Sequence, residues 1–129
     1  TVPKITINLR KSYGGSHIVM GCKQLRSDLN FAWPSAEIAV MGASGAVAIL
    51  CGKEAKKIKE EGGDVRAFLA EKEEDYTETF ANPYQAAQYG YIDDVIEPRN
   101  TRFRICRGLA QLATKRQDIP AKKHACMPM

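Results

Sequence analysis

The sequence has no apolar run long enough to cross a membrane and few residues suited to a metal site. Its 129 residues include two histidines and four cysteines. The cysteines are widely spaced and form no C-x-x-C pair, so we expect no metal ion and no zinc centre. They are Cys22, Cys51, Cys106 and Cys126. We expect free thiols in a reducing, cytoplasmic setting and no membrane partner.

The residues for a nucleophile with its base and orienting acid are also missing. Neither His17 nor His124 has an evident carboxylate partner in the sequence, and a lone histidine is usually a hydrogen-bonded structural residue. The acidic cluster at residues 71–75 is interpreted as a solvated helix face. The net charge of +4 is scattered along the chain, so we expect no nucleic-acid partner.

What the sequence does contain is a strand, glycine, helix pattern that occurs twice. Residues 4–9 are predicted to form a strand, followed by a glycine pair and a helix over residues 16–22. A second strand, predicted at residues 36–41, runs through Gly42 into an apolar helix. We expect residues 1–9 and 37–41 to be neighbouring strands of one sheet, with both glycine corners at the same edge.

The second half of the chain is predicted to be mainly helical. Helices are expected over residues 65–80, from Pro83 onward, and over residues 102–114, with a short strand at residues 92–96. Asp64 and Asn82 are suitable N-caps for the first two of these helices. Residues 28–34 are expected to be irregular or extended, and the tail after Gln117 irregular.

The glycine corners offer backbone N–H groups at the start of a helix, where the helix dipole adds positive potential. Such a corner can hold a developing oxyanion without any side chain, which suits enolate chemistry on a thioester or a similarly polarised carbonyl. A glycine pair after a strand is more often a tight turn, and the residues alone leave both interpretations open.

Long ordered motifs connect the chain to a known family. They are TVPK at residues 1–4, RKSYGG at 10–15, LNFAWPSAEIAVMGA at 29–43, GAV at 45–47, NPY at 82–84, GYIDDVIEPR at 90–99 and KKH at 122–124. Together they strongly resemble the biotin-dependent acyl-CoA carboxyltransferase β subunits, with the propionyl-CoA carboxylase and methylmalonyl-CoA decarboxylase members nearest. The resemblance covers essentially the whole chain.

The resemblance implies an α/β, crotonase-like fold, which is a spiral of strand, strand, helix (ββα) units. Residues 1–129 would be the last part of the C-terminal domain, because family members are much longer. The sequence begins in an apparent strand without a Met, and we expect it to be a fragment. The implied assembly is a homo-oligomer, a hexamer in the family.

The implied reaction moves a carboxyl group between biotin and the α-carbon of an acyl-CoA. Biotin would be attached to a separate carrier protein, and the partners would be the biotin carboxyl carrier and biotin carboxylase subunits. In the mechanism proposed for the family, carboxybiotin releases CO₂ and the resulting ureido anion removes the α-proton. One oxyanion pocket holds the ureido oxygen, and a second pocket in the other domain holds the thioester enolate.

Carried over by position, the N–H groups of Gly15 and Ser16 are the catalytic oxyanion donors on the biotin side. Gly14, Gly42 and Ala43 would complete the biotin-binding corner. No side-chain base is required by this mechanism, in agreement with the absence of one in the sequence.

The corner departs from the family pattern at its end. Propionyl-specific members commonly show Gly-Gly-Ala-Tyr followed by Asp, where this chain has Ser16, His17 and Ile18 after the glycines. Backbone donation survives the change to Ser16. Ile18 borders the acyl pocket by resemblance and is the expected specificity residue.

Three functions remain open on the sequence. The chain is interpreted as the biotin-side half of a propionyl-CoA carboxylase-type carboxyltransferase, inactive without the rest of the subunit. A methylmalonyl-CoA decarboxylase subunit would use the same chemistry in the opposite direction. A non-catalytic half-domain for assembly or carrier docking is the third alternative.

Overall fold

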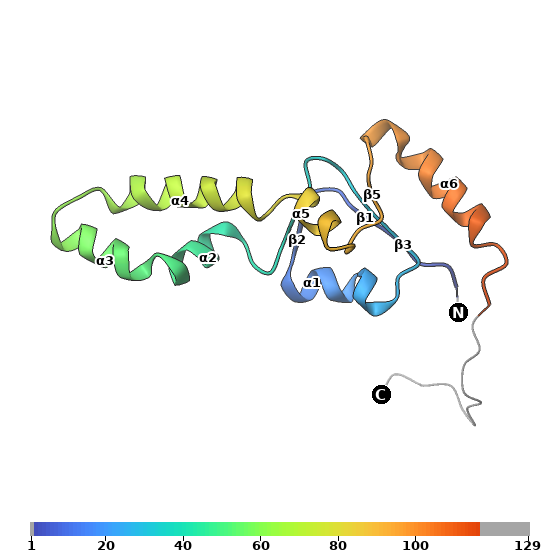
Figure 1. Cartoon of the computed structure of the whole chain (residues 1–129), viewed down its shortest axis with the longest axis horizontal. Helices are drawn as coiled ribbons and strands as arrows, with labels where there is room; N and C mark the ends of the chain where they lie inside the picture. The colour runs from blue at the N-terminus through green and yellow to red at the C-terminus, as the bar shows by residue number, and fades with distance from the viewer. Residues whose placement is uncertain (1, 117–129) are drawn as a thin grey trace, which may run out of the picture.

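The computed structural model describes residues 2–116 and shows a small α/β body with a helical arm projecting from one side (Figure 1). Two strand–strand–helix units begin the chain. The first unit is β1 (Ile5–Asn8), β2 (Lys11–Tyr13) and α1 (Gly14–Val19). The second is β3 (Leu29–Ala32), β4 (Glu37–Ala39) and α2 (Ala43–Leu50). This is the repeated unit expected of the predicted spiral.

The strands of these units separate into two parallel sheets. The first strand of each unit joins a three-stranded sheet of order β1-β3-β5, in which β5 is Asp94–Val95. The second strands, β2 and β4, pair with each other in a two-stranded sheet. Each unit therefore contributes one strand to each sheet.

The prediction that residues 1–9 and 37–41 are neighbours in one sheet is wrong. β1 pairs with β3, and β4 pairs with β2. The chain bends between the two strands of each unit, so residues 5–8 and 37–39 belong to different sheets. The two glycine corners nevertheless lie together, because β2 and β4, which lead into them, are parallel partners.

Residues 28–34, expected to be irregular or extended, contain the central strand of the larger sheet. Pro34 lies beyond the end of β3, so its missing N–H group does not interrupt the pairing. Phe31 and Ala32 are buried in this strand. Trp33 continues the pairing, because its N–H donates to the carbonyl oxygen of Asn8 at 2.9 Å.

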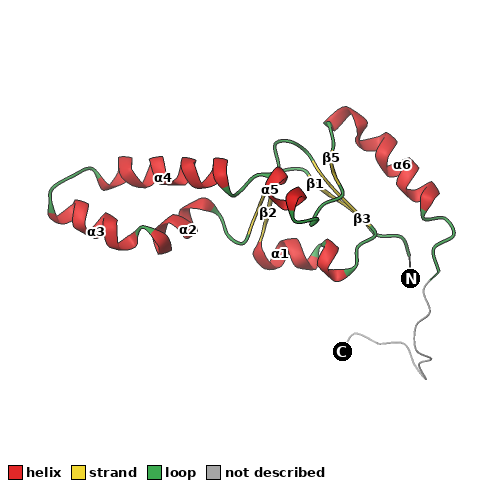
Figure 2. Ribbon diagram, viewed as in Figure 1, coloured by secondary structure: helices red, strands yellow, loops and turns green. Residues whose placement is uncertain are grey.

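The arm consists of α2, α3 (Gly52–Glu60) and α4 (Val65–Thr79), with α4 running back beside the other two (Figure 2). Its turn is set by Asp64, whose Oδ1 accepts hydrogen bonds from the N–H groups of Arg66 and Ala67 at 3.0 and 3.1 Å. The expected helix and its N-cap are thus confirmed. The charged residues 52–60, which the sequence left unassigned, form α3.

Two helices complete the body. α5 (Pro83–Gln88) begins as predicted, with Asn82 Oδ1 accepting from the N–H of Gln85 at 3.0 Å. Its Ala86 packs with Ala32, Ala36 and Ile92 in the core. After a short turn, η2 (Pro98–Asn100), α6 (Thr101–Gln111) lies against the larger sheet through Gly108, where a Cβ atom would be 2.7 Å from a methyl group of Leu29.

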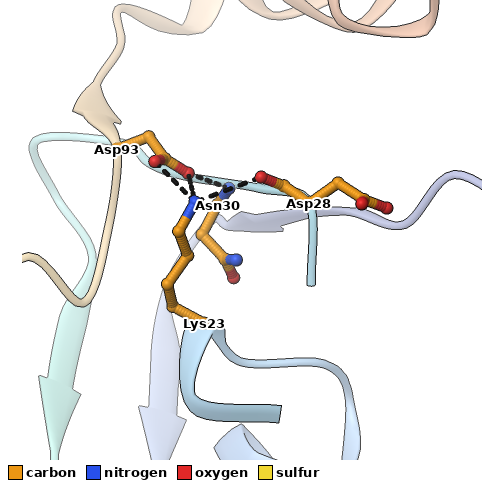
Figure 3. Close-up of polar contacts among 4 residues, drawn as sticks. All are labelled: Lys23, Asp28, Asn30 and Asp93. Atoms are coloured by element: carbon orange, nitrogen blue, oxygen red, sulfur yellow. Dashed lines mark hydrogen bonds and ion pairs between the residues drawn. The ribbon is translucent and has the colours of Figure 1, made fainter. Parts of the chain in front are cut away.

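A polar cluster joins residues 23–30 to the distant Asp93 at one end of the larger sheet (Figure 3). Lys23, in the short helix η1 (Lys23–Leu25), places its Nζ 2.7 and 2.8 Å from the two carboxylate oxygens of Asp93. The same Nζ donates to the carbonyl oxygen of Asp28 at 3.1 Å, and Asp93 accepts from the N–H of Asn30 at 2.8 Å. The loop before β5 is therefore tied to both β3 and η1.

Three of the four cysteines lie in the described part of the chain. Cys22, Cys51 and Cys106 are free thiols, and Cys22 is buried. Cys126, His124 and the expected irregular tail lie outside the described residues. Within residues 2–116, none of the helices combines the length and apolar character needed to cross a membrane.

Candidate active site

The two glycine corners lie side by side at the carboxyl ends of β2 and β4. A Cβ atom built on Gly14 would lie 2.8 Å from the carbonyl oxygen of Val40, directly after β4. A Cβ atom on Gly42 would lie 3.5 Å from the ring of Tyr13, the last residue of β2. Glycine at position 14 therefore allows a close approach of the corners, whereas the space at Gly42 corresponds to an ordinary van der Waals contact.

Each corner leaves backbone N–H groups without a helical partner. Tyr13 is the N-cap of α1 and Gly42 is the N-cap of α2, and no side chain among the described residues caps either helix. The N–H groups of the first three helical residues have no acceptor within an α-helix. In α1 these residues are Gly14, Gly15 and Ser16, and in α2 the first is Ala43.

The predicted biotin-side residues are therefore brought together. Gly14, Gly15, Ser16, Gly42 and Ala43 all belong to these two adjacent corners. Apart from its chain neighbours and the backbone of α1, no atom of the described residues lies within 4 Å of a Cβ atom built on Gly15, so this side of the residue is open. The catalytic and cofactor-binding roles of the five residues stay predictions.

A tyrosine lies beneath the paired corners and connects their strands. The Tyr13 hydroxyl donates a hydrogen bond to a carboxylate oxygen of Glu37, across from β2 to β4. Burial, with a further contribution from the Glu37 hydrogen bond, raises the pKa of Tyr13 to about 12. The phenol therefore stays protonated at neutral pH and keeps donating to Glu37.

Two further hydrogen bonds cross the first corner. The Oγ of Ser12 lies 2.8 Å from Nδ1 of His17, and the Ser16 hydroxyl donates to the carbonyl oxygen of Tyr13 at 2.6 Å. Burial lowers the pKa of His17 below its ordinary value, which favours the neutral imidazole. The sequence does not identify this pair, because the partner of His17 is a hydroxyl five residues earlier and not a carboxylate.

The structure places Ile18 near the C-terminal end of α1, outside the glycine corner. Ile18 is 47% exposed and lines an open hollow of about 450 Å³ between α1 and β1. Val19, Met20 and Leu25 line the same hollow, together with the polar residues Lys4, Thr6 and Ser27, so its wall is mixed in character. The specificity role of Ile18 remains a prediction.

Comparison with known proteins agrees with this geometry. Residues 1–127 match the family model described as the carboxyl transferase domain. The chain is 49% identical over 129 residues to the propionyl-CoA carboxylase beta chain of Saccharopolyspora erythraea. It is 52% identical over 128 residues to the methylmalonyl-CoA carboxyltransferase 12S subunit of Propionibacterium freudenreichii subsp. shermanii. These alignments cover 100% and 99% of this chain but 24% of each relative.

Solved structures give the same result. A transcarboxylase 12S crystal structure, described as a hexamer with methylmalonyl-coenzyme A and methylmalonic acid bound, superposes with a TM-score of 0.84 at 51% identity. The superposition includes 100% of this chain and 24% of the transcarboxylase chain. The beta subunit of the Pseudomonas aeruginosa geranyl-CoA carboxylase superposes at 0.67 with 26% identity, over 86% of this chain and 21% of that one.

The paired strands, the amide-bearing corners and these matches define a carboxyltransferase domain. The chain belongs to the carboxyl transferase domain family, and its predicted crotonase-like fold is confirmed. It spans about a quarter of the length of the curated relatives that it matches.

Proposed function

We propose that this chain forms the biotin-side half of a carboxyltransferase active site and is the last part of the C-terminal domain of a longer subunit. The observation that carries the proposal is the pair of adjacent corners, where no side chain of residues 2–116 caps either helix, in a chain of the carboxyl transferase domain family. Backbone donors already fixed in place lower a reaction barrier without a side-chain base.

The donor set fits a ureido oxygen. The N–H groups of Gly15 and Ser16 are neighbours in the first turn of α1, and no side chain at Gly15 blocks them. When present on its carrier protein, biotin supplies the carboxyl group that is transferred and the base that removes a proton from the acyl-CoA. Gly15 and Ser16 would stabilise the oxygen that becomes negative, while Gly14, Gly42 and Ala43 shape the corner around it.

The hollow at the C-terminal end of α1 is the candidate place for the second substrate, an acyl-CoA. Ile18 and Met20 line it, and both belong to the segment immediately after the proposed donors. We assign the short acyl chain to this side of the site. The thioester-side donors would come from the rest of the subunit, because this chain covers only a quarter of its relatives.

The proposed subunit acts together with partner proteins in the cytoplasm. The partners are a biotin carboxyl carrier and a biotin carboxylase, and the assembly is a homo-oligomer; one related structure is described as a hexamer. The three described cysteines are free thiols, which supports a cytoplasmic location.

Sequence identity does not distinguish carboxylation from decarboxylation as the direction of the reaction. The Saccharopolyspora erythraea carboxylase chain and the methylmalonyl-CoA decarboxylase subunit alpha of Propionigenium modestum are each 49% identical to this chain. The decarboxylase function therefore stays as the second candidate, and a non-catalytic half-domain as the third.

Labelled carboxyl transfer tests the proposal. The complete subunit containing residues 1–129 is mixed with carboxylated, biotin-bearing carrier and propionyl-CoA, and the label in the thioester is measured. We expect transfer by the complete subunit and none by residues 1–129 alone. A folded complete subunit that transfers no label would support the non-catalytic alternative, and full activity of residues 1–129 would contradict the division of the site.

A further inference from the structure

The glycine corner at the start of α1 has little of its own to fix its geometry. Gly14 has φ +50, in the left-handed region, and no other residue meets the Cβ position of Gly15. The N-cap residue, Tyr13, makes no side-chain hydrogen bond to the helix. Because glycine gives the backbone wide conformational freedom, the directions of the following N–H groups depend on contacts made elsewhere.

Those contacts come from the residues that flank the corner. Ser12 precedes it on β2 and His17 follows it on α1, and their side chains meet at 2.8 Å. The hydrogen bond therefore closes a loop around residues 13–16, which include both proposed oxyanion donors. Ser16 adds a second bond inside the loop, from its hydroxyl to the Tyr13 carbonyl oxygen.

The chemistry of the pair suits a lasting contact. Both residues are half-buried, so water competes less for their polar atoms than it does at the surface. A hydroxyl both donates and accepts, and an imidazole nitrogen does one or the other according to its proton. Either tautomer of His17 thus pairs with Ser12.

We infer that Ser12 and His17 are positioning residues, whose hydrogen bond holds the N–H groups of Gly15 and Ser16 in the orientation that carboxyl transfer requires. The inference rests on the proposed function. Neither side chain needs to touch a substrate, because the effect passes through the backbone between them. Misplacement of a donor by a fraction of an ångström lowers the rate more than it lowers the affinity for substrate.

The test uses four variants of the complete subunit. Ser12→Ala and His17→Phe each remove the hydrogen bond. The double variant loses the same single bond and no other contact between these two side chains. His17→Asn is the matched control, because its side-chain amide places a polar atom near the position of Nδ1 and can still pair with Ser12. Steady-state rates with propionyl-CoA and carboxylated carrier give kcat and KM for each.

We expect Ser12→Ala and His17→Phe each to lower kcat roughly 10-fold with less than a twofold change in KM for propionyl-CoA. The double variant should be no slower than the slower single variant, since one contact is lost in all three. His17→Asn should keep kcat within about twofold of the parent. Independent, multiplying losses, or a His17→Asn variant as slow as His17→Phe, would overturn the inference.

Hydrogen exchange separates this inference from the proposed function. The N–H of Met20 donates to the carbonyl oxygen of Ser16 at 3.1 Å, so its exchange reports on the order of α1. Ser12→Ala should accelerate exchange in peptides ending near Met20, whether or not the parent transfers carboxyl groups. Unchanged exchange would refute the positioning role. Faster exchange in a parent without transfer activity would instead reject the proposed function alone.

Discussion

Gly14 and Val40 are in contact across the two-stranded sheet: a Cβ atom on Gly14 would lie 2.8 Å from the Val40 carbonyl oxygen. Gly14 begins α1, and Val40 directly follows β4. This close approach adds to the pairing of β2 with β4, which brings the two glycine corners together. It also distinguishes Gly14, which is required by the backbone, from Gly15, which the fold leaves open.

Gly14→Ala should therefore destabilise the protein. The new methyl group meets a backbone oxygen and the residue has φ +50, so we expect a loss of about 1–3 kcal/mol in the free energy of unfolding. Thermal or denaturant unfolding measures it. Gly15→Ala is the matched control and should change stability by less than about 0.5 kcal/mol, because no atom lies within 4 Å of the added Cβ. Equal effects of both substitutions would show that the contact is not restrictive.

Gly15→Val is expected to impair catalysis without unfolding the protein. The side chain has space in the fold, but it covers the N–H groups through which the ureido oxygen would be bound. In the complete subunit we expect kcat to fall roughly 10²-fold, with little change in KM for the acyl-CoA. Steady-state kinetics beside a thermal melt test this expectation. A normally folded variant with unchanged kcat would mean that the glycines serve only the turn.

The loss of folding stability at low pH should depend on Asp28. Hydrogen bonds from Lys115 and then from the N–H of Lys4 hold the pKa of Asp28 below its ordinary value of 3.8. A carboxyl group whose pKa is lower in the folded state stabilises the protein above its unfolded pKa, and this contribution is lost as the pH falls through the folded value. Unfolding measured between pH 7 and pH 2 should therefore show a smaller acid-dependent loss for Asp28→Asn than for the parent.

Asp75 supplies the control for this experiment. Its carboxylate pairs with Lys72 at 3.4 Å on the surface of α4, where the Asp75 side chain is 63% exposed. Exposed pairs of this kind contribute little to stability. Asp75→Asn should leave the pH profile close to that of the parent, and a profile as altered as that of Asp28→Asn would contradict the assignment.

Ile18 should influence the choice of acyl chain. Contact with an apolar side chain such as Ile18 distinguishes neighbouring chain lengths by only about 1–3 kcal/mol per methylene, so we expect comparable kcat/KM values for acetyl-, propionyl- and butyryl-CoA. Ile18→Asp introduces a charge into the hollow and should narrow that range. The three values of kcat/KM are compared for both forms of the complete subunit. If the three kcat/KM values show the same pattern in the parent and in Ile18→Asp, Ile18 serves only in packing.

The helices were more predictable from the sequence than the sheets. Asp64 and Asn82 mark the starts of α4 and α5 because their side chains accept hydrogen bonds from the first helical N–H groups. β2 is three residues long and carries no alternating pattern that distinguishes it from a turn. The division into two sheets depends on bends after β1 and β3, which a local pattern does not show.

The candidate site was predictable in its backbone and not in its side chains. Glycine pairs identify a corner, and the resemblance selects the residues that supply N–H groups. The Ser12–His17 contact instead depends on how α1 is placed relative to β2, which a local sequence pattern does not show. The cross-strand bond from Tyr13 to Glu37 likewise requires the register of a strand pair that was not foreseen.

The order of the strands affects how the chain folds while it is being synthesised. β3 has β1 on one side as soon as residues 29–32 emerge, but its other neighbour, β5, arrives much later. The hydrogen bond from Asn30 to Asp93 spans 63 residues, which a ribosome adds over several seconds at about 5–20 residues per second. During that interval one edge of β3 is unpaired and open to other chains, while the arm of α2, α3 and α4 closes through its own local contacts. A translational pause between α4 and β5 would prolong this exposure, whereas a pause after α6 would not.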